Sequence, residues 1–350
     1  MKAEIKKYLL KFKRPSGTSR GILQTKETWF LILQVEGKFG VGECGLFRGL
    51  SYDDVPEFEN KLQWVKDHIN IGLHKLLENL TDFPSIQFGL EQAFISIENE
   101  SPFELFSSPF LRKESPIAIN GLIWMGDPEF MRGQIHEKLE QGFSCIKMKI
   151  GAIDFNKELG LLESIRKDFS ADEIELRVDA NGAFSPNDAL VKLKDLAQFE
   201  LHSIEQPIKQ GNWLAMKELC KRTPLPIALD EELIGVNNVT KKEELLLIIQ
   251  PQYIILKPSL VGGFGGSGEW ISLAEKHQIG WWITSALESN IGLNAIAQWT
   301  ATLKNTMPQG LGTGSLFINN FKSPLEVKNG SLYYNRTKSW ERNLIKDLCI

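Results

Sequence analysis

The sequence has few cysteines, and they are not arranged to form a disulfide framework or a zinc site. Its 350 residues include four cysteines that lie far apart and make no C-x-x-C pair: Cys44, Cys145, Cys220 and Cys349. Small secreted domains with disulfide frameworks are much richer in cysteine, and structural zinc sites need ligands at short spacing. The sequence therefore excludes both classes and indicates a reducing compartment, which we expect to be the cytoplasm.

Long apolar runs and an excess of positive charge are also missing. Lys and Arg number 40 against 44 Asp and Glu, a net charge of −4, so no basic surplus would attract nucleic acid or an anionic membrane. No apolar stretch approaches the ~18 residues that span a bilayer. The first ten residues lack the apolar core of a signal peptide. We expect neither nucleic acid nor a membrane as a partner, and the oligomeric state stays open.

The chain is rich in residues that can form a large core. Hydrophobic residues make up 42%, with 20 Phe and 9 Trp, which excludes a disordered chain. A (β/α)8 barrel takes roughly 250 residues, so this length fits one barrel and about 100 residues more. Residues 22–43 predict a β-hairpin, and residues 56–77 and 85–98 predict helices. Up to about residue 115, the chain therefore predicts an α+β unit.

From about residue 115, short apolar runs alternate with amphipathic stretches. The runs are residues 117–123, 145–150, 174–178, 201–204, 227–229, 253–256 and 280–284, with a candidate eighth near 309–311. The helical stretches between them are residues 128–140, 155–168, 187–199, 213–222, 239–249 and 269–276. This alternation predicts parallel strands with helices outside, and so many strands favour a closed barrel over an open sheet. The tail from about residue 321 is expected to be irregular and to pack back on the first unit.

Charged residues stand where most of the predicted strands end. In strand order they are Lys147 and Lys149, Asp179, Glu205, Asp230 and Lys257. The carboxyl ends of the strands of one barrel meet at one mouth, where barrel active sites lie. We therefore expect these side chains to surround a single site.

Three carboxylates at one mouth would repel each other unless a cation compensates their charge. Oxygen ligands suit a hard divalent cation, so Asp179, Glu205 and Asp230 predict a Mg²⁺ site, with Mn²⁺ as the alternative. Lys147 and Lys149 lie two apart on a strand and share a face. A neighbouring ammonium, a metal and partial burial each lower the pKa of a lysine, which prepares it to act as a base. A metal beside a neutral lysine suits removal of a proton α to a carboxylate, with the metal stabilising the enediolate.

Each of these residues also has a purely structural interpretation. A single acid at a strand end is most often a helix N-cap or a surface charge, and Lys147 alone could be a salt-bridge partner. The histidines, at positions 68, 74, 136, 202 and 277, end no predicted strand and are interpreted as structural, which disfavours a hydrolase with histidine metal ligands. Residues 263–268 match G-x-G-x-x-G, but a dinucleotide site follows the first strand of its fold directly. We expect these glycines to approach the substrate or bind an anion instead.

Five short motifs carry a family resemblance. They are Lys-x-Lys at 147–149, Asp-Ala-Asn at 179–181, Glu-Gln-Pro at 205–207, Asp-Glu at 230–231 and Lys-Pro at 257–258. Together they resemble the enolase superfamily, muconate-lactonizing-enzyme subgroup. The resemblance implies an α/β fold, a modified (β/α)7β TIM-type barrel with an α+β capping domain formed from the N-terminal region and the C-terminal tail. It divides the chain into the capping domain (1–116), the barrel (117–317) and a returning segment (318–350), with loops 14–21 and 45–52 closing the site.

Longer segments carry a narrower resemblance, at residues 14–21, 42–51, 120–124, 284–292 and 312–317. They resemble the o-succinylbenzoate synthases of that subgroup, of the type found in Bacteroidetes. The implied reaction is a Mg²⁺-dependent syn dehydration of 2-succinyl-6-hydroxy-2,4-cyclohexadiene-1-carboxylate in menaquinone biosynthesis. The expected partner is therefore a small dicarboxylate substrate.

The resemblance also implies roles for single residues. Asp179, Glu205 and Asp230 would bind the metal. Lys149 would be the general base and Lys147 would tune it. Lys257 would face the other side of the substrate, where it could contact the ring anion by a cation–π interaction. The residues implied in substrate binding are Asn120, Asn181, Gly262, Gly263, Ser285 and Arg20.

Neighbouring activities of the subgroup use the same core residues. An N-succinylamino acid racemase or a dipeptide epimerase would use Lys149 and Lys257 as two bases on opposite faces of the substrate. Dipeptide epimerases have an Asp-x-Asp pattern at the seventh strand, where this chain has the segment 286–290, and this favours a substrate without an α-ammonium group. A barrel that only binds ligands is disfavoured, because the set of lysines and carboxylates is complete.

Overall fold

A computed structural model describes residues 1–18, 21–112, 115–341 and 344–348. It begins with an antiparallel sheet of β1 (Lys2–Thr18), β2 (Gly21–Val35) and β3 (Lys38–Cys44). β2 and β3 form the predicted hairpin, and Glu36 and Gly37 turn between them with φ values of 48° and 84°. The sequence pattern does not predict β1, because adjacent residues of one kind, such as Leu9 and Leu10, break its period-two alternation.

Short helices follow this sheet and, with it, form a unit called here the cap. They are α1 (Phe58–Asp67), η1 (Ile69–Ile71), α2 (Leu73–Glu78) and α3 (Pro84–Glu98). The predicted helix over 56–77 is split, because Gly72 adopts a φ of 91° that no right-handed helix contains. α3 lies so close to β3 that a Cβ at Gly42 would be 1.8 Å from the carbonyl oxygen of Gly89. This helix and this strand therefore touch through their backbones.

The next unit is a parallel barrel, which confirms the predicted fold class. Its strands pair in chain order: β5 (Gly121–Ile123), β6 (Cys145–Lys149), β7 (Glu175–Asp179), β8 (Ser203–Glu205), β9 (Ile227–Leu229), β10 (Tyr253–Leu256) and β11 (Gly280–Ile283). The candidate eighth strand joins the two edges of this sheet, since Gln309 pairs with Ile119 and Gly310 pairs with Thr284, both in parallel. These bridges close the barrel.

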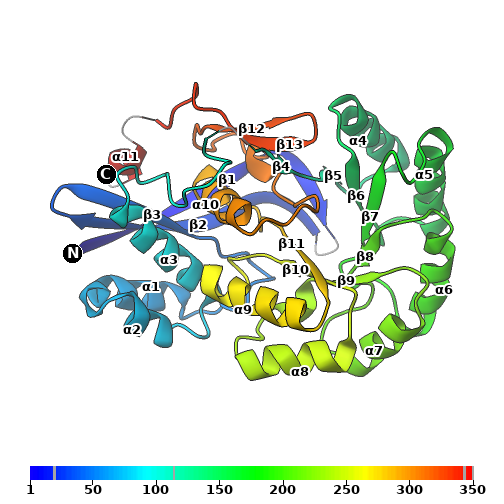
Figure 1. Cartoon of the computed structure of the whole chain (residues 1–350), viewed down its shortest axis with the longest axis horizontal. Helices are drawn as coiled ribbons and strands as arrows, with labels where there is room; N and C mark the ends of the chain where they lie inside the picture. Colours follow the sequence, from blue (N-terminus) through cyan, green and yellow to red (C-terminus); the bar gives the residue numbers. More distant parts are fainter. Residues whose placement is uncertain (19–20, 113–114, 342–343, 349–350) are drawn as a thin grey trace.

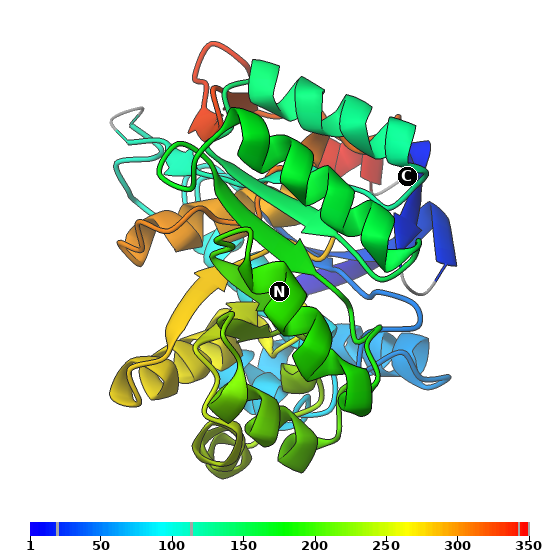
Figure 2. The ribbon, with the colours of Figure 1, turned by 90° about the vertical axis from the view of Figure 1, so that its right-hand side faces the viewer.

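One helix follows each strand from β5 to β11 and lies outside the barrel (Figure 1, Figure 2). They are α4 (Pro128–Glu140), α5 (Phe155–Asp168), α6 (Pro186–Ala197), α7 (Trp213–Arg222), α8 (Val239–Ile249), α9 (Gly263–Lys276) and α10 (Asn290–Thr302). Asp, Asn or Ser side chains cap the N-termini of all of these but α9, and the predicted bounds of α4 to α8 agree closely. α9 begins at Gly263, ahead of the predicted residue 269. α10 was not predictable from amphipathic periodicity, because residues 291–300 are all buried.

The tail is not irregular, contrary to expectation. β12 (Leu325–Lys328) and β13 (Ser331–Tyr334) form a hairpin around Asn329 and Gly330, the residue pair that most strongly signals a tight hairpin turn. β13 also pairs with β4 (Ile117–Ala118), and single helical turns lie at η2 (Glu231–Leu233) and η3 (Thr313–Ser315). The last helix, α11 (Leu344–Leu348), shares a hydrophobic cluster with Phe30 of β2, and Figure 1 shows it beside the cap.

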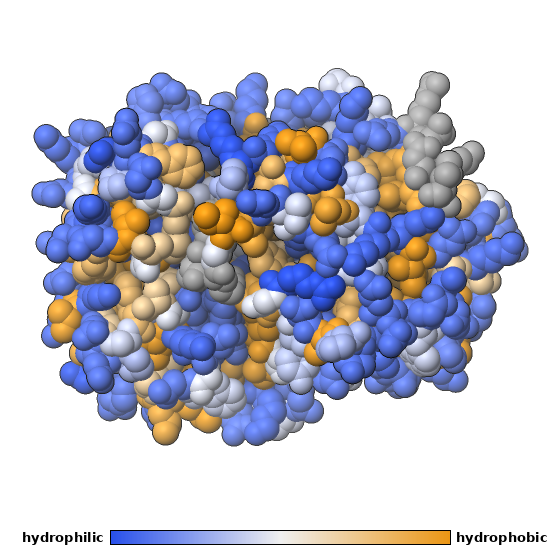
Figure 3. All heavy atoms as spheres, turned by 180° about the vertical axis from the view of Figure 1, so that it is seen from behind, coloured by the Kyte–Doolittle hydropathy of each residue, from blue (hydrophilic) through white to orange (hydrophobic). Residues whose placement is uncertain are grey.

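The surface of the molecule mixes polar and apolar residues. Figure 3 shows, from behind, small groups of hydrophobic side chains among hydrophilic ones. Within the residues that the structure describes, no helix is both long enough and apolar enough to cross a membrane. Cys44, Cys145 and Cys220 are buried free thiols, in agreement with the absence of a disulfide framework.

Candidate active site

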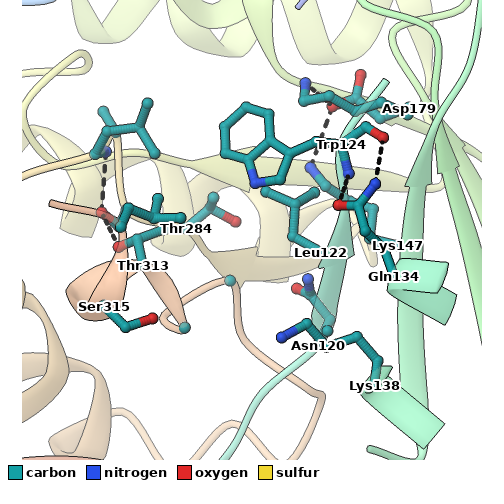
Figure 4. Close-up of a pocket in the computed structure, with 18 of the residues that line it drawn as sticks. Asn120, Leu122, Trp124, Gln134, Lys138, Lys147, Asp179, Thr284, Thr313 and Ser315 are labelled. Atoms are coloured by element: carbon teal, nitrogen blue, oxygen red, sulfur yellow. Dashed lines mark hydrogen bonds and ion pairs between the residues drawn. The ribbon is translucent and has the colours of Figure 1, made fainter. Parts of the chain in front are cut away.

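A cavity of about 360 Å³ lies at the carboxyl ends of the barrel strands. Figure 4 shows Lys147 and Asp179 on one side of it, with Thr284 and Thr313 on the other. Its barrel side includes Asn120, Lys147, Lys149, Asp179, Asn181, Lys257, Thr284 and Ser285, and its cap side includes Lys13, Arg14, Pro15, Phe47 and Leu50. Barrel and cap therefore enclose the cavity together, at the end of the barrel where enzymes of this architecture bind substrates.

Both predicted cap loops contribute residues to this cavity. Arg14 and Pro15 belong to the first predicted loop but lie within strand β1, and Phe47 and Leu50 come from the second loop. The second loop is held by its own hydrogen bonds, since the Phe47 amide donates to Ser51 Oγ at 2.8 Å. An apolar wall over the cavity is therefore supplied by a compact loop of the cap.

Strand register brings the predicted charged residues together. Lys149 of β6 lies beside Asp179 of β7, and Asp179 lies beside Glu205 of β8. Lys149 Nζ donates to Asp179 Oδ2 at 2.9 Å, and Lys147 Nζ donates to the same oxygen at 3.2 Å. Lys147 Nζ also donates to Glu205 Oε2 at 2.5 Å. Two lysines and two carboxylates thus form one buried network at adjacent strand ends.

Asp230 and Lys257 extend this network around the mouth. Asp230 directly follows β9 and Lys257 directly follows β10. Lys257 Nζ donates to Asp230 Oδ2 and lies 3.9 Å from Glu205 Oε1. The three carboxylates are almost inaccessible to solvent, at 0% exposure for Asp179 and 2% for the other two. The structure therefore places all six predicted charged residues in one network.

Burial and mutual repulsion set the charge of the network. Burial alone would raise the pKa of Asp179, but Lys149 and Lys147 outweigh it and hold that pKa below its usual range. Burial and the charge of Asp179 raise the pKa of Glu205 to about 8, although lysines are in contact with it. At neutral pH the Glu205 carboxyl is therefore largely protonated, and its ionisation requires further positive charge nearby.

The carboxylates around Lys147 hold it as an ammonium group. Burial lowers this pKa, but the charges of Glu205 and Asp179 more than offset burial, so the pKa lies above its usual value. The same balance of burial against Asp230 raises the pKa of Lys257. The sequence-based expectation assumed a cation between the carboxylates, whereas here the ammonium groups themselves contact them.

Asp179, Glu205 and Asp230 have the donor chemistry and the charge that a hard divalent cation requires. Glu205 Oε1 is buried and has no hydrogen-bond partner in the described part of the chain. Among the described residues no three His, Cys, Asp or Glu side chains are already gathered as metal ligands, since lysine amines lie between these carboxylates. The residues therefore fit a cation that would take over part of the charge compensation.

Asn181 and Glu231 orient the amine of Lys149. Asn181 Oδ1 accepts a hydrogen bond from Lys149 Nζ at 2.7 Å, and Asn181 Nδ2 donates to Glu231 Oε1 at 2.9 Å. Asn181 has a φ of 43°, a conformation that asparagine tolerates better than most residues. Asn181 also lines the cavity, so its contact with substrate stays a prediction beside this observed contact with Lys149.

Two of the other residues predicted to bind substrate, Asn120 and Ser285, line the cavity. Ser285 Oγ donates its proton to Glu288 Oε2 at 2.5 Å and accepts a hydrogen bond from Thr313 Oγ1 at 2.9 Å. Its hydroxyl is therefore committed within the chain. Sequence reasoning missed the neighbouring Thr284, which also lines the cavity and whose buried Oγ1 has no partner among the described residues.

The glycine-rich turn before α9 binds an anion of its own chain. Gly262 and Gly263 are not among the described residues that line the cavity. The Phe264 amide donates to Glu91 Oε2 of α3 at 2.5 Å, and a Cβ at Gly263 would meet the same oxygen at 2.2 Å. The position of Gly262 and Gly263 thus gives no support to their predicted substrate contact, because the turn docks the cap helix. Arg20, also predicted to bind substrate, lies outside the described residues.

Sequence reasoning also missed an apolar wall of the cavity. Leu122 and Trp124 line it together with Asn120, and Figure 4 shows these three side chains along β5. Gln134 of α4 holds the Trp124 backbone by two hydrogen bonds of 3.0 and 2.9 Å. The signal was available in the sequence, because residues two apart on a strand share a face.

Comparison with known proteins places this geometry in context. The family model described as "Enolase C-terminal domain-like" matches residues 131–337. An o-succinylbenzoate synthase of Desulfotalea psychrophila is 49% identical over 352 residues, which cover 92% of this chain and 95% of that protein. The crystal structure of MenC from the same organism has a TM-score of 0.84 at 44% identity, and the match covers 95% of this chain and 99% of that one. An N-succinylamino acid racemase of Amycolatopsis is 24% identical, over 94% of this chain and 90% of the racemase.

Proposed function

This chain belongs to the enolase superfamily, and we propose that it is an o-succinylbenzoate synthase, a lyase acting in menaquinone biosynthesis. Its substrate is then 2-succinyl-6-hydroxy-2,4-cyclohexadiene-1-carboxylate, from which it removes water. One observation carries the proposal. Identity to the Desulfotalea synthase extends over nearly the whole of both chains and far exceeds identity to the racemase. The charged network suits both a synthase and a racemase, so it supports removal of an α-proton in general. The high identity over nearly the whole chain supports the synthase over the racemase.

In this proposal Asp179, Glu205 and Asp230 hold Mg²⁺, with Mn²⁺ as the alternative. The bound cation supplies positive charge beside the ring carboxylate, where removal of the α-proton adds negative charge. Lys147 contacts both Asp179 and Glu205 and shares in compensating their charge. Glu205 Oε1, which is buried without a hydrogen-bond partner among the described residues, supports the assignment.

Lys149 is the proposed general base. Its amine has hydrogen-bond acceptors in Asp179 and Asn181, at 2.9 and 2.7 Å. A neutral amine has two N–H groups and one lone pair, so these two acceptors can take both hydrogens. The lone pair is then left for the proton α to the ring carboxylate.

The same lysine completes the dehydration. After the first transfer, Lys149 is an ammonium group on the face from which it took the proton. It protonates the ring hydroxyl on that face while the C–O bond breaks, and water leaves. The electrons of the broken C–H bond form the new ring double bond, so the ring becomes aromatic and no oxidant is needed. Lys257 is proposed to face the other side of the ring and stabilise its negative charge by a cation–π contact.

A direct assay tests this function. Purified protein with Mg²⁺ and the cyclohexadiene substrate should form o-succinylbenzoate, and EDTA should stop the reaction until Mg²⁺ is returned. Folded, metal-loaded protein that does not turn over this substrate would overturn the proposal.

Substitution of the base tests the assignment of roles. Lys149→Ala should reduce kcat by about 10²–10⁴, the usual contribution of a general base. Lys194→Ala is the matched control, because Lys194 is exposed on α6 and should leave kcat unchanged. A Lys149→Ala variant with nearly full activity would show that another group removes the proton.

A second activity is favoured by the position of Lys257. Its amine lines the same cavity as that of Lys149 and contacts a different carboxylate, Asp230. Two bases on two sides of a bound substrate would racemise N-succinylamino acids. Incubation in D₂O should then place deuterium at the α-carbon of both enantiomers, and Lys257→Ala should restrict exchange to one of them.

A further inference from the structure

A buried group of charges lies behind the cavity wall and takes no part in the proposed chemistry. It consists of Lys26 of β2, Glu43 of β3 and Glu288 of the loop between β11 and α10, and is called here the anchor cluster. Their exposures are 6%, 0% and 0%. Lys26 Nζ is buried without a hydrogen-bond partner in the described part of the chain, and the charges of both glutamates act on it. The cap therefore buries a lysine amine in the same region as these carboxylates, and burial lowers the pKa of that amine.

Glu288 connects two loops of the barrel mouth. Ser259 Oγ donates to Glu288 Oε1 at 2.5 Å, and Ser285 Oγ donates to Glu288 Oε2 at 2.5 Å. Ser259 lies two residues after Lys257, and Ser285 lines the cavity. Both carboxylate oxygens are therefore used to hold the ends of β10 and β11 in a fixed relation.

Glu43 attaches the cap to the same loop. It accepts hydrogen bonds from Thr28 Oγ1, from the amide and the hydroxyl of Ser289, and from the Gly292 amide, at 2.9, 2.9, 2.5 and 2.9 Å. Three of these four donors belong to the barrel. The end of β3, from which loop 45–52 departs, is thereby fixed to the segment that carries Glu288.

Gly45 brings that loop directly onto the serine bridge. A Cβ at Gly45 would lie 3.2 Å from Glu288 Cγ and 3.3 Å from Ser259 Cβ. No side chain separates the start of the loop from Glu288. Phe47 and Leu50, which line the cavity, follow within a few residues. The placement of these two apolar side chains therefore depends on the position of Glu288.

We propose that Glu288 is a positioning residue that sets loop 45–52 over the bound substrate. The inference rests on the proposed dehydration. Glu288 acts through Ser259, Ser285 and Gly45 and does not touch the reacting atoms. Its substitution should therefore weaken substrate binding and leave the proton-transfer step nearly intact.

Glu288→Gln is the central test. Glutamine keeps the shape of the side chain but offers one acceptor oxygen in place of two, so one of the two serine hydroxyls loses the acceptor of its hydrogen bond. We expect KM for the cyclohexadiene substrate to rise about tenfold while kcat changes by less than about threefold, as for a loss of binding that is uniform along the reaction. Gln298→Met is the matched control: Gln298 is buried in α10 and binds Phe103 O and the Leu105 amide, each at 2.7 Å. It should lower Tm and leave KM unchanged.

A double-substitution cycle tests the link between Ser259 and Glu288. Ser259→Ala and Glu288→Gln should each lower Tm, because each disturbs the buried hydrogen bond that joins the two side chains. The two together should lower Tm by less than the sum of the single losses, while KM stays as high as in Glu288→Gln. Tm can be measured without turnover, so the cycle can be interpreted even if the wild type is not a dehydratase. Lack of dehydratase activity in the wild type would itself overturn the positioning role.

Several outcomes would overturn the inference. They are a wild-type KM in Glu288→Gln, an equal rise of KM in Gln298→Met at equal loss of Tm, and strictly additive Tm losses. If Glu288→Gln does not fold, Ser259→Ala replaces it, because it removes one arm of the bridge and leaves the pair of Ser285 and Glu288 in place. It should raise KM several-fold with an unchanged kcat, and a wild-type KM would contradict the proposal.

Discussion

Gly42→Ala should disrupt the contact between strand β3 and helix α3 of the cap. A Cβ at position 42 would lie 1.8 Å from Gly89 O and 2.8 Å from Ala93 N. Non-bonded atoms are most stable at separations of about 3.5–4.0 Å. The new methyl group therefore has no room, and the atoms that block it belong to the backbone of a regular helix.

The size of the effect follows from what has to move. A side chain could rotate away, but here β3 and α3 must separate by more than an ångström. That movement would open the cluster in which Cys44 packs with Ile86 and Leu90. Overpacking of a core costs about 1–3 kcal/mol when side chains can adjust, so we expect a loss of about 3 kcal/mol or more in the free energy of unfolding.

Urea unfolding, followed by far-ultraviolet circular dichroism and tryptophan fluorescence, measures this loss as a lower midpoint. Gly133→Ala is the matched control, since Gly133 lies within α4 and a Cβ there meets no atom within 4 Å. It should stabilise the protein by about 0.5–1 kcal/mol, the helix-interior difference between glycine and alanine. A Gly42→Ala protein with the wild-type midpoint would refute the close packing of β3 on α3.

Three further substitutions probe the site and its surroundings. Asn181→Leu removes an acceptor from Lys149 and should lower kcat by about 10–100-fold, because a misplaced catalytic group can cost that much; an unchanged kcat would exclude the orienting role. Burial raises the pKa of Glu91 to about 7, from 4.5. The folded state therefore binds this proton more tightly, and stability is lost as pH rises from about 4.5 to about 7. Glu91→Gln should remove that part of the slope in urea unfolding at several pH values, and an unaltered slope would show that Glu91 is not the cause. Thr284→Val should leave stability within about 0.5 kcal/mol, because the hydroxyl has no hydrogen-bond partner among the described residues. Because this hydroxyl lines the cavity, the substitution should raise KM several-fold in steady-state kinetics. A wild-type KM would show that the hydroxyl does not bind substrate.

The charged network was accessible from sequence because its members interrupt apolar runs at regular steps. Asp179, Glu205 and Lys257 each stand at the end of a short apolar run, and parallel pairing carries the ends of such runs to one place. Period two was enough to put Lys147 and Lys149 on one face. The alternation of side chains along a strand does not predict whether the lysine amines are charged. Their protonation depends on whether a cation or the carboxylates themselves lie nearest to them.

Contacts between distant parts of the chain were not accessible in this way. The turn around Gly263 has the pattern of an anion site, but its anion is Glu91 of the cap, some 170 residues earlier. Ser285 has the position of a substrate ligand, but its proton is held by Glu288. In both cases a polar group near the site already has a hydrogen-bond partner that only the packed structure identifies. Helix α10 was missed for a different reason, because a fully buried helix has no polar face.

The molecule therefore separates the groups that react from the groups that select. Lys149, Asp179 and Glu205 are fixed by hydrogen bonds between parallel strands, and those bonds do not pass through the cap. Phe47 and Leu50 reach the cavity from a loop whose position depends on Glu43 and its barrel partners. Changes along the strand ladder should thus appear first in kcat, and changes at the cap attachment should appear first in KM. The cap can therefore change its contacts with the substrate without disturbing the strand ends.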